Sequence, residues 1–177
     1  MTSIAGVGTR WRLGARTRKA VLLVHIAAAG AWLGVDVVMG VLVFTALGSD
    51  SARTKALCFQ ALELFAVGAL LAAGLTCLAT GVVLGLGSKY GLLRYWWVAA
   101  KLGLNLVLTA LVPVALAPTV AGAAAQGRRF LAGQPATLAV GDLVFPPVVS
   151  PTALLVAMTL AVFKPWGRIR KPPPARG

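Results

Sequence analysis

The stretch AVLLVHIAAAGAWLGVDVVMGVLVFTAL, residues Ala20–Leu47, decides the fold of this chain. It runs for about 28 residues and contains only two ionisable side chains, His25 and Asp36. About 20 apolar residues, at 1.5 Å of rise per residue, cross a hydrocarbon core of about 30 Å, so the stretch predicts a membrane-spanning helix. It is also too long for a cleaved signal peptide, whose apolar region has about 7–15 residues.

Three further apolar stretches follow, at Leu57–Leu86, Trp96–Leu116 and Pro147–Phe163. Hydrophobic residues make up 59% of the 177-residue chain and charged residues only 12%. That charged share is about half of what soluble domains carry. The sequence therefore predicts an all-α, integral membrane four-helix bundle over residues 20–163, with no room for a separate soluble domain.

The positive charge gathers at one end of the predicted spans. A basic segment, residues 1–19, precedes the first span, and a basic, proline-rich tail, residues 164–177, follows the last. Lys89 and Arg94 lie in the connection between the second and third spans. The other end carries only four basic residues: Arg53, Lys55, Arg128 and Arg129. By the positive-inside rule, we expect a multi-pass protein of a bacterial plasma (inner) membrane with both termini in the cytoplasm.

The formal net charge of +13 also raises the question of a nucleic-acid partner. Its placement at the cytoplasmic ends of the spans favours a different partner, the anionic lipids of the inner leaflet. We therefore expect contact with the bilayer surface and no binding of nucleic acid.

The connections indicate how the spans are ordered. The first two are short, so the first three spans are expected to be antiparallel neighbours. The third, residues 118–146, is longer and rich in Ala, Gly and Pro. Its part Thr119–Gln126 is a candidate extension of the third helix, kinked at Pro113 and Pro118, and the rest is an outer connector or a lid.

Two small-xxx-small patterns, Gly30–Gly34 and Gly81–Gly85, allow close approach of helix backbones. Either pattern fits the bundle interior or the seam of a homodimer, and the sequence leaves both readings open.

Five polar side chains within the spans are the candidate functional residues, because such groups are costly in lipid and usually face inward. They are His25, Asp36, Glu63, Lys101 and Asn105. In the first span, His25, Trp32 and Asp36 follow each other at spacings that place all three on one helical face.

Counting from the cytoplasmic ends places these groups at different depths. His25, Thr80, Lys101 and Met158 fall in one inner layer, with Cys77 one turn deeper. Asp36 and Asn105 fall near the midplane, and Glu63 falls near the outer face. We expect the Asp36 carboxyl to be protonated or to bond Asn105 or Lys101.

The inner layer is a candidate cofactor site. Neutral imidazole binds haem iron and copper, and a thioether at matching depth makes Met158 a candidate second ligand beside His25. The chain has one histidine, which excludes bis-His haem within a monomer. A His/Met pair, a five-coordinate haem or a haem shared across a dimer remain. Copper would require more soft ligands than Cys77 and Met158 at that level.

Three segments carry a family resemblance. They are LLVHIAAAGAWLGVDVVMG (residues 22–40), LLRYWWVAAKLGLNLVLTALV (residues 92–112) and AVFKPWGRIRK (residues 161–171). In these segments the chain resembles an actinobacterial four-span integral membrane family of unknown function. It is more distantly similar to HemJ-type protoporphyrinogen oxidases and CopD-type copper-resistance proteins.

The distant resemblance implies a role for two residues. His25 corresponds to the inward histidine of the first helix in both types, and Lys101 corresponds to the HemJ-type lysine. The HemJ-type likeness implies haem b and porphyrin oxidation, with Lys101 near a haem propionate or a substrate carboxylate. HemJ-type proteins carry further histidines, which this chain lacks.

Three hypotheses about function follow. The first is a structural or accessory bundle that packs with itself or with another complex. The second is a haem-binding redox protein or oxidase that uses His25. The third is a small proton-coupled carrier that uses Asp36, Asn105 and Lys101.

Overall fold

The computed structural model describes residues 14–87, 92, 95–163 and 167. They form five α-helices: α1 (Ala15–Gly48), α2 (Ala52–Leu86), α3 (Trp96–Leu111), α4 (Ala117–Leu131) and α5 (Phe145–Phe163). A π-helical turn, Val112–Leu116, joins α3 to α4, and a 3-10 turn, Gly141–Val144, precedes α5. Most of the basic N-terminal segment and of the C-terminal tail, with Lys89 and Arg94, falls outside the described residues.

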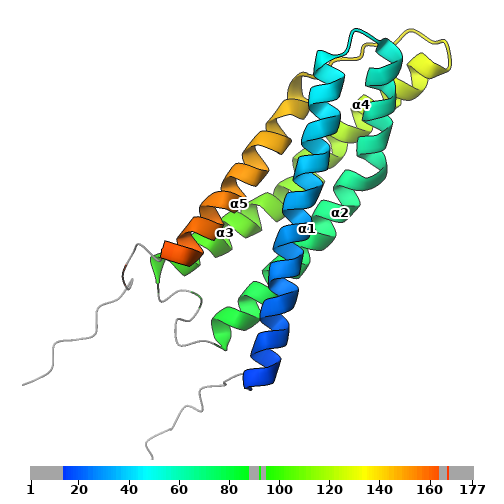
Figure 1. The fold of residues 1–177 in the computed structure, drawn as a ribbon. Coiled ribbons are helices and arrows are strands. Elements are labelled where there is room, and N and C mark those ends of the chain that lie inside the picture. The colour runs from blue at the N-terminus through cyan, green and yellow to red at the C-terminus, as the bar shows by residue number, and fades with distance from the viewer. Residues whose placement is uncertain (1–13, 88–91, 93–94, 164–166, 168–177) are drawn as a thin grey trace, which may run out of the picture.

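These elements make four helices that are long and apolar enough to cross a membrane: Ala15–Gly48, Ala52–Leu86, Trp96–Leu131 and Gly141–Phe163. The described residues contain no strand. The predicted all-α, four-helix membrane bundle is therefore confirmed, and the chain is a multi-pass membrane protein. Figure 1 shows the four long helices running side by side.

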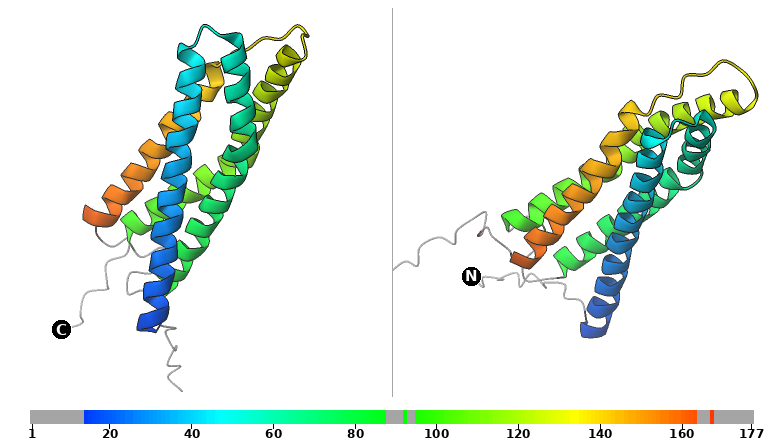
Figure 2. Two further views of the ribbon diagram at one scale, coloured as in Figure 1. Left: turned by 45° about the vertical axis from the view of Figure 1, so that its right-hand side comes forward. Right: turned by 45° about the horizontal axis from the view of Figure 1, so that its top comes forward.

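The antiparallel pair α1 and α2 forms the main packing unit of the bundle. The tight connection Ser49–Ser51 joins the two helices, and the Ser51 hydroxyl caps α2 by accepting a hydrogen bond from the Thr54 amide at 3.3 Å. Helix α5 packs against α1 and α3, while α4 packs against α2, as the views in Figure 2 show. Every helix thus has at least one neighbour within the bundle.

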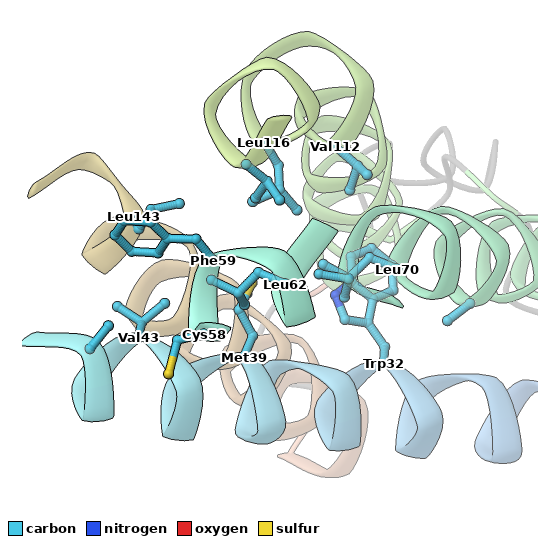
Figure 3. Close-up of a cluster of buried hydrophobic side chains, with 14 of the residues drawn as sticks. Trp32, Met39, Val43, Cys58, Phe59, Leu62, Leu70, Val112, Leu116 and Leu143 are labelled. Atoms are coloured by element: carbon cyan, nitrogen blue, oxygen red, sulfur yellow. The ribbon is translucent and has the colours of Figure 1, made fainter. Parts of the chain in front are cut away.

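The buried core lies between these helices (Figure 3). Met39 and Val43 of α1 point toward Phe59 and Leu62 of α2, and Trp32 of α1 lies beside Leu70. These side chains are almost completely buried. The core therefore follows one stripe of α1, on which Trp32 and Asp36 also lie.

The third span bends without breaking. Pro113 and Pro118 lack the amide hydrogen that a continuous α-helix requires. The chain forms the π-turn there, closed by a hydrogen bond from the Ala117 amide to the Val112 carbonyl, and then continues as α4 to Leu131. The expected extension over Thr119–Gln126 is confirmed, and it reaches five residues further.

At its end, α4 makes a close backbone contact with α2. A Cβ added at Gly127 would lie 2.8 Å from the Ala56 carbonyl oxygen, so only glycine fits. Beside this crossing, Arg128 forms an ion pair with Glu63. Gly133, with φ of +73°, then ends the helix in the left-handed conformation that glycine adopts without strain.

Candidate functional site

Two clusters of polar side chains lie inside the bundle, and the first surrounds Asp36. The Trp32 indole nitrogen donates a hydrogen bond to the Ser150 hydroxyl at 3.0 Å. That hydroxyl in turn donates to the Asp36 Oδ2 atom at 2.8 Å. Since Asp36 is 1% exposed, this chain of hydrogen bonds fastens α1 to α5 within the bundle.

The second oxygen of the same carboxyl group lacks such a partner. Asp36 Oδ1 is buried, and no donor from the described residues reaches it. Pro151, inside α5, also lacks the amide that would otherwise bond the Pro147 carbonyl one turn earlier. The wall of the site therefore includes a buried acceptor, Asp36 Oδ1, that no donor among the described residues reaches.

Asp36 opens onto a groove between α1 and α5 of about 530 Å³. Apart from Asp36, its lining is Val37, Gly40, Val41, Phe44, Thr45, Pro147 and Pro151. Val37, Val41 and Phe44 are exposed on the outer surface of the bundle, where lipid would cover them. The groove therefore joins a buried carboxyl group to the lipid-facing side of the protein.

The second cluster surrounds His25 and faces α2. The His25 Nδ1 atom lies 2.9 Å from the Thr80 hydroxyl oxygen and 3.1 Å from the Cys77 carbonyl oxygen. The Thr80 hydroxyl donates its own hydrogen to the Thr76 carbonyl at 2.6 Å. Nδ1 must then be the donor to both oxygen atoms, because a carbonyl only accepts. This arrangement leaves the lone pair on Nε2, which lies 4.0 Å from the Cys77 sulfur.

Helix α3 completes this inner cluster. The Lys101 ammonium group lies 4.7 Å from the centre of the Trp97 ring, a cation–π contact, and its charge acts on both His25 and Cys77. The Asn105 side-chain oxygen accepts a hydrogen bond from the Thr109 hydroxyl at 3.4 Å. The inner cluster thus draws on α1, α2 and α3.

Gly74 of α2 marks the boundary between the clusters. A Cβ at Gly74 would lie 2.8 Å from the Thr109 hydroxyl and 2.9 Å from Cζ3 of Trp32. The two clusters therefore meet across the carbon edge of the indole, whose only polar atom points the other way, to Ser150. An indole carbon edge has no group that carries a proton, so Trp32 separates the clusters chemically.

The structure brings together part of the predicted inner layer. His25 meets Thr80 and Cys77, with Lys101 close enough to act on them. Met158 lies on the surface of α5 and is 36% exposed, whereas the bonded nitrogen of His25 faces α2.

The other predicted polar residues have partners that the sequence did not identify. Glu63 pairs with Arg128 beside the crossing of α4 and α2. Asp36 bonds Ser150 instead of the expected Asn105 or Lys101. Sequence reasoning missed Ser150, although a hydroxyl between Pro147 and Pro151, one turn into the last span, is a signal that depth counting could have used.

The small-residue patterns also lie in different surroundings. A Cβ at Gly81 would lie 3.3 Å from the His25 ring, and one at Gly85 would lie 2.5 Å from Leu92, so this pattern faces the bundle interior. A Cβ at Gly30 or Gly34 would meet nothing within 4 Å. The homodimer seam therefore stays a prediction for the α1 pattern alone.

Comparison of the chain with protein-family models, with curated proteins and with solved structures gave no match. The resemblance to HemJ-type and CopD-type proteins therefore remains a prediction. Within the described residues, no group of three or more His, Cys, Asp or Glu side chains is placed to hold a metal ion.

Proposed function

We propose that this protein is an accessory bundle of the bacterial inner membrane, which associates with another membrane helix through the groove between α1 and α5. The observation that carries the proposal is the buried Asp36 side chain, which lines a lipid-facing groove and whose Oδ1 atom receives no hydrogen bond from the described residues. A buried polar atom without a partner is costly in lipid, so an outside group that supplies a donor would be bound favourably.

The other intramembrane polar groups support the same proposal. Trp32, Ser150 and the second Asp36 oxygen connect α1 to α5, and His25 connects α1 to α2. Each of these hydrogen bonds joins helices of this chain, which is what a scaffold requires. In the same proposal both termini lie in the cytoplasm, where the basic segments meet anionic lipid.

Site-specific photo-crosslinking in native membranes tests this function. A crosslinking residue at Val41, on the wall of the groove, is expected to capture a neighbouring membrane protein as one discrete band. Val38, at nearly the same depth on α1 but outside the groove, is the matched control. Equal capture at both positions, or none at Val41, would contradict an association through the groove.

A second candidate function rests on the His25 tautomer. Because Nδ1 donates to Thr80 and Cys77, the ring is held in place with the lone pair on Nε2, 4.0 Å from the Cys77 sulfur. This hydrogen bonding on the far nitrogen is what orients a histidine that ligates a metal. The residues fit a single axial ligand to haem b better than a His25/Met158 pair, since Met158 lies at the surface.

An absorption spectrum of the detergent-purified protein tests the haem function. Oxidised and dithionite-reduced samples of the wild type are compared with His25→Ala. A stoichiometric Soret band that disappears in the variant is the expected result for a haem protein. A colourless wild type, purified from haem-replete cells, would remove this candidate and leave the accessory function untouched.

A further inference from the structure

We infer that the groove between α1 and α5 receives a transmembrane helix of a different membrane protein, and that this helix places a Lys or Arg side chain beside Asp36. The inference rests on the proposed accessory function and adds to it the chemistry of the partner. It joins three observations: an incompletely bonded carboxyl group, the shape of the groove and the positions of this chain's own basic residues.

The carboxyl group calls for a donor that also carries positive charge. A carboxylate accepts up to about four hydrogen bonds, and the described residues supply Asp36 with one, from Ser150. The groove that Asp36 lines is otherwise valine, glycine, phenylalanine and proline, with Thr45 further along α1. In such apolar surroundings an ammonium or guanidinium group compensates a buried carboxylate more fully than a neutral hydroxyl does.

The shape of the groove suits a helix. On α1 its lining residues Val37, Gly40, Val41 and Phe44 follow the i, i+3, i+4, i+7 spacing of one helical face. On α5, Pro147 and Pro151 are one turn apart. Gly40 forms the floor between the two helices: it is buried, and a Cβ there would be in ordinary van der Waals contact with Pro147, at 3.6 Å. Two parallel helical ridges above a glycine floor form the surface into which a third helix packs.

A second copy of this chain does not supply the cation at the right depth. Both copies would insert in the same direction, so equal depths would meet. Thr109 lies level with Trp32 at Gly74, Lys101 is eight residues further inward, and Asp36 is four residues further outward. Lys101 and Asp36 are thus separated by roughly 18 Å in depth.

The other described basic residues lie at helix ends, away from the middle of α1: Arg16, Arg18, Lys19, Arg53, Lys55, Arg128 and Arg129. Among the described residues, a second copy of this chain therefore brings no positive charge to the depth of Asp36. Charge complementarity thus favours a heterologous partner over self-association in this groove.

Binding of synthetic transmembrane peptides to the full-length protein in lipid vesicles tests the inference. The probe is a labelled poly-Leu/Ala helix of about 21 residues with one central Lys. Its matched peptide has Leu at the same position. We expect energy transfer from labelled protein to the Lys peptide at a concentration at least tenfold lower than to the Leu peptide. The variant Asp36→Asn is expected to abolish this preference, and Glu63→Gln, which removes a carboxylate outside the groove, is expected to preserve it.

The outcomes separate the inference from the function beneath it. Equal binding of the Lys and Leu peptides to the wild type, or an unchanged preference in Asp36→Asn, would overturn the basic partner. If both peptides bind equally but Gly40→Leu, which fills the groove floor, prevents binding, the docking function stands and only the cation fails. Energy transfer between two copies of the protein that is lost in Asp36→Asn would also overturn the inference, in favour of self-association. Circular dichroism and monodispersity of each variant establish that it is folded.

Discussion

The cluster around His25 and the cluster around Asp36 contain similar groups but differ in how fully their hydrogen bonds are satisfied. Each joins a polar side chain of α1 to a hydroxyl group on a neighbouring helix, Thr80 in one case and Ser150 in the other. The His25 ring finds its acceptors within α2, including a backbone carbonyl. Among the described residues, the Asp36 carboxyl finds one donor, and its other oxygen has no partner.

The difference arises from what each partner helix can supply. Helix α2 offers His25 the Cys77 carbonyl and a threonine that is itself bonded to its own helix, so the hydrogen bonds close. An α-helix has no spare amide hydrogen in its middle turns, so an acceptor such as Asp36 obtains donors only from side chains. A buried acidic group inside a helical bundle is therefore harder to satisfy internally than a histidine.

The largest expected effect comes from the residue that the two clusters share. Trp32→Ala removes a side chain that is 1% exposed and packs on Gly74, and it takes away the hydrogen bond to Ser150. We expect a loss of about 3–5 kcal/mol in the free energy of unfolding, as for other buried aromatic truncations. Unfolding in mixed detergent micelles, followed by circular dichroism, measures it.

Trp96→Ala is the control for that measurement, because Trp96 is exposed on the surface of α3. Its unfolding curve is expected to stay close to the wild type. A similar loss in both variants would mean that Trp32 does not hold the two clusters in their separate places.

The second largest effect is expected at Gly74, which lies at the boundary between the two clusters. Gly74→Ala would place a methyl group 2.8 Å from the Thr109 hydroxyl and 2.9 Å from the Trp32 ring, so these side chains, or α2 relative to α1 and α3, must shift. Overpacking of this kind costs about 1–3 kcal/mol, which a shift in the thermal unfolding midpoint reports. Gly68→Ala on the same helix meets nothing within 4 Å, and we expect that control to be neutral or stabilising. Equal effects of the two substitutions would contradict a close contact at Gly74.

The sequence predicted the spans and the inner cluster well, since both follow from counting along helices. Apolar length determined the four membrane helices, and equal depth from the helix ends brought His25 and Thr80 together. The partner of Asp36 could not be found in this way. Depth states how far along a helix a residue lies, but the pairing with Ser150 depends on how α5 is rotated about its axis.

The bend in the third span shows the same limit. Pro113 and Pro118 predicted a kink but not the π-turn that absorbs it, because a freed carbonyl can be satisfied in several ways. The orientation of α4, with Gly127 on Ala56, follows from that turn and could not be read from the residues alone.

We expect the Asp36 cluster, which keeps an oxygen without a partner in the described part of the chain, to be more sensitive to loss of its hydroxyl group than the His25 cluster. Ser150→Ala removes the only donor to Asp36 among the described residues and the acceptor of the Trp32 indole, which leaves buried groups unpaired on both sides. We expect a loss of about 1–2 kcal/mol in unfolding free energy. Thr152→Ala, two residues away, removes a hydroxyl that is exposed and bonds only its own helix, and it serves as the control. An effect no larger than that of the control would show that the Asp36 cluster does not fasten α5.

The smallest effect on stability is expected at the His25 cluster. Thr80→Val removes the hydroxyl acceptor, but His25 Nδ1 keeps the Cys77 carbonyl at 3.1 Å, so no donor is stranded. A loss of about 0.5–1 kcal/mol follows from one hydrogen bond that has a substitute. Thr76→Val, whose hydroxyl is exposed and bonds within α2, is the matched control. If Thr80→Val lowered the free energy of unfolding as much as Ser150→Ala, Asp36 would not differ from His25 in how fully its hydrogen bonds are satisfied.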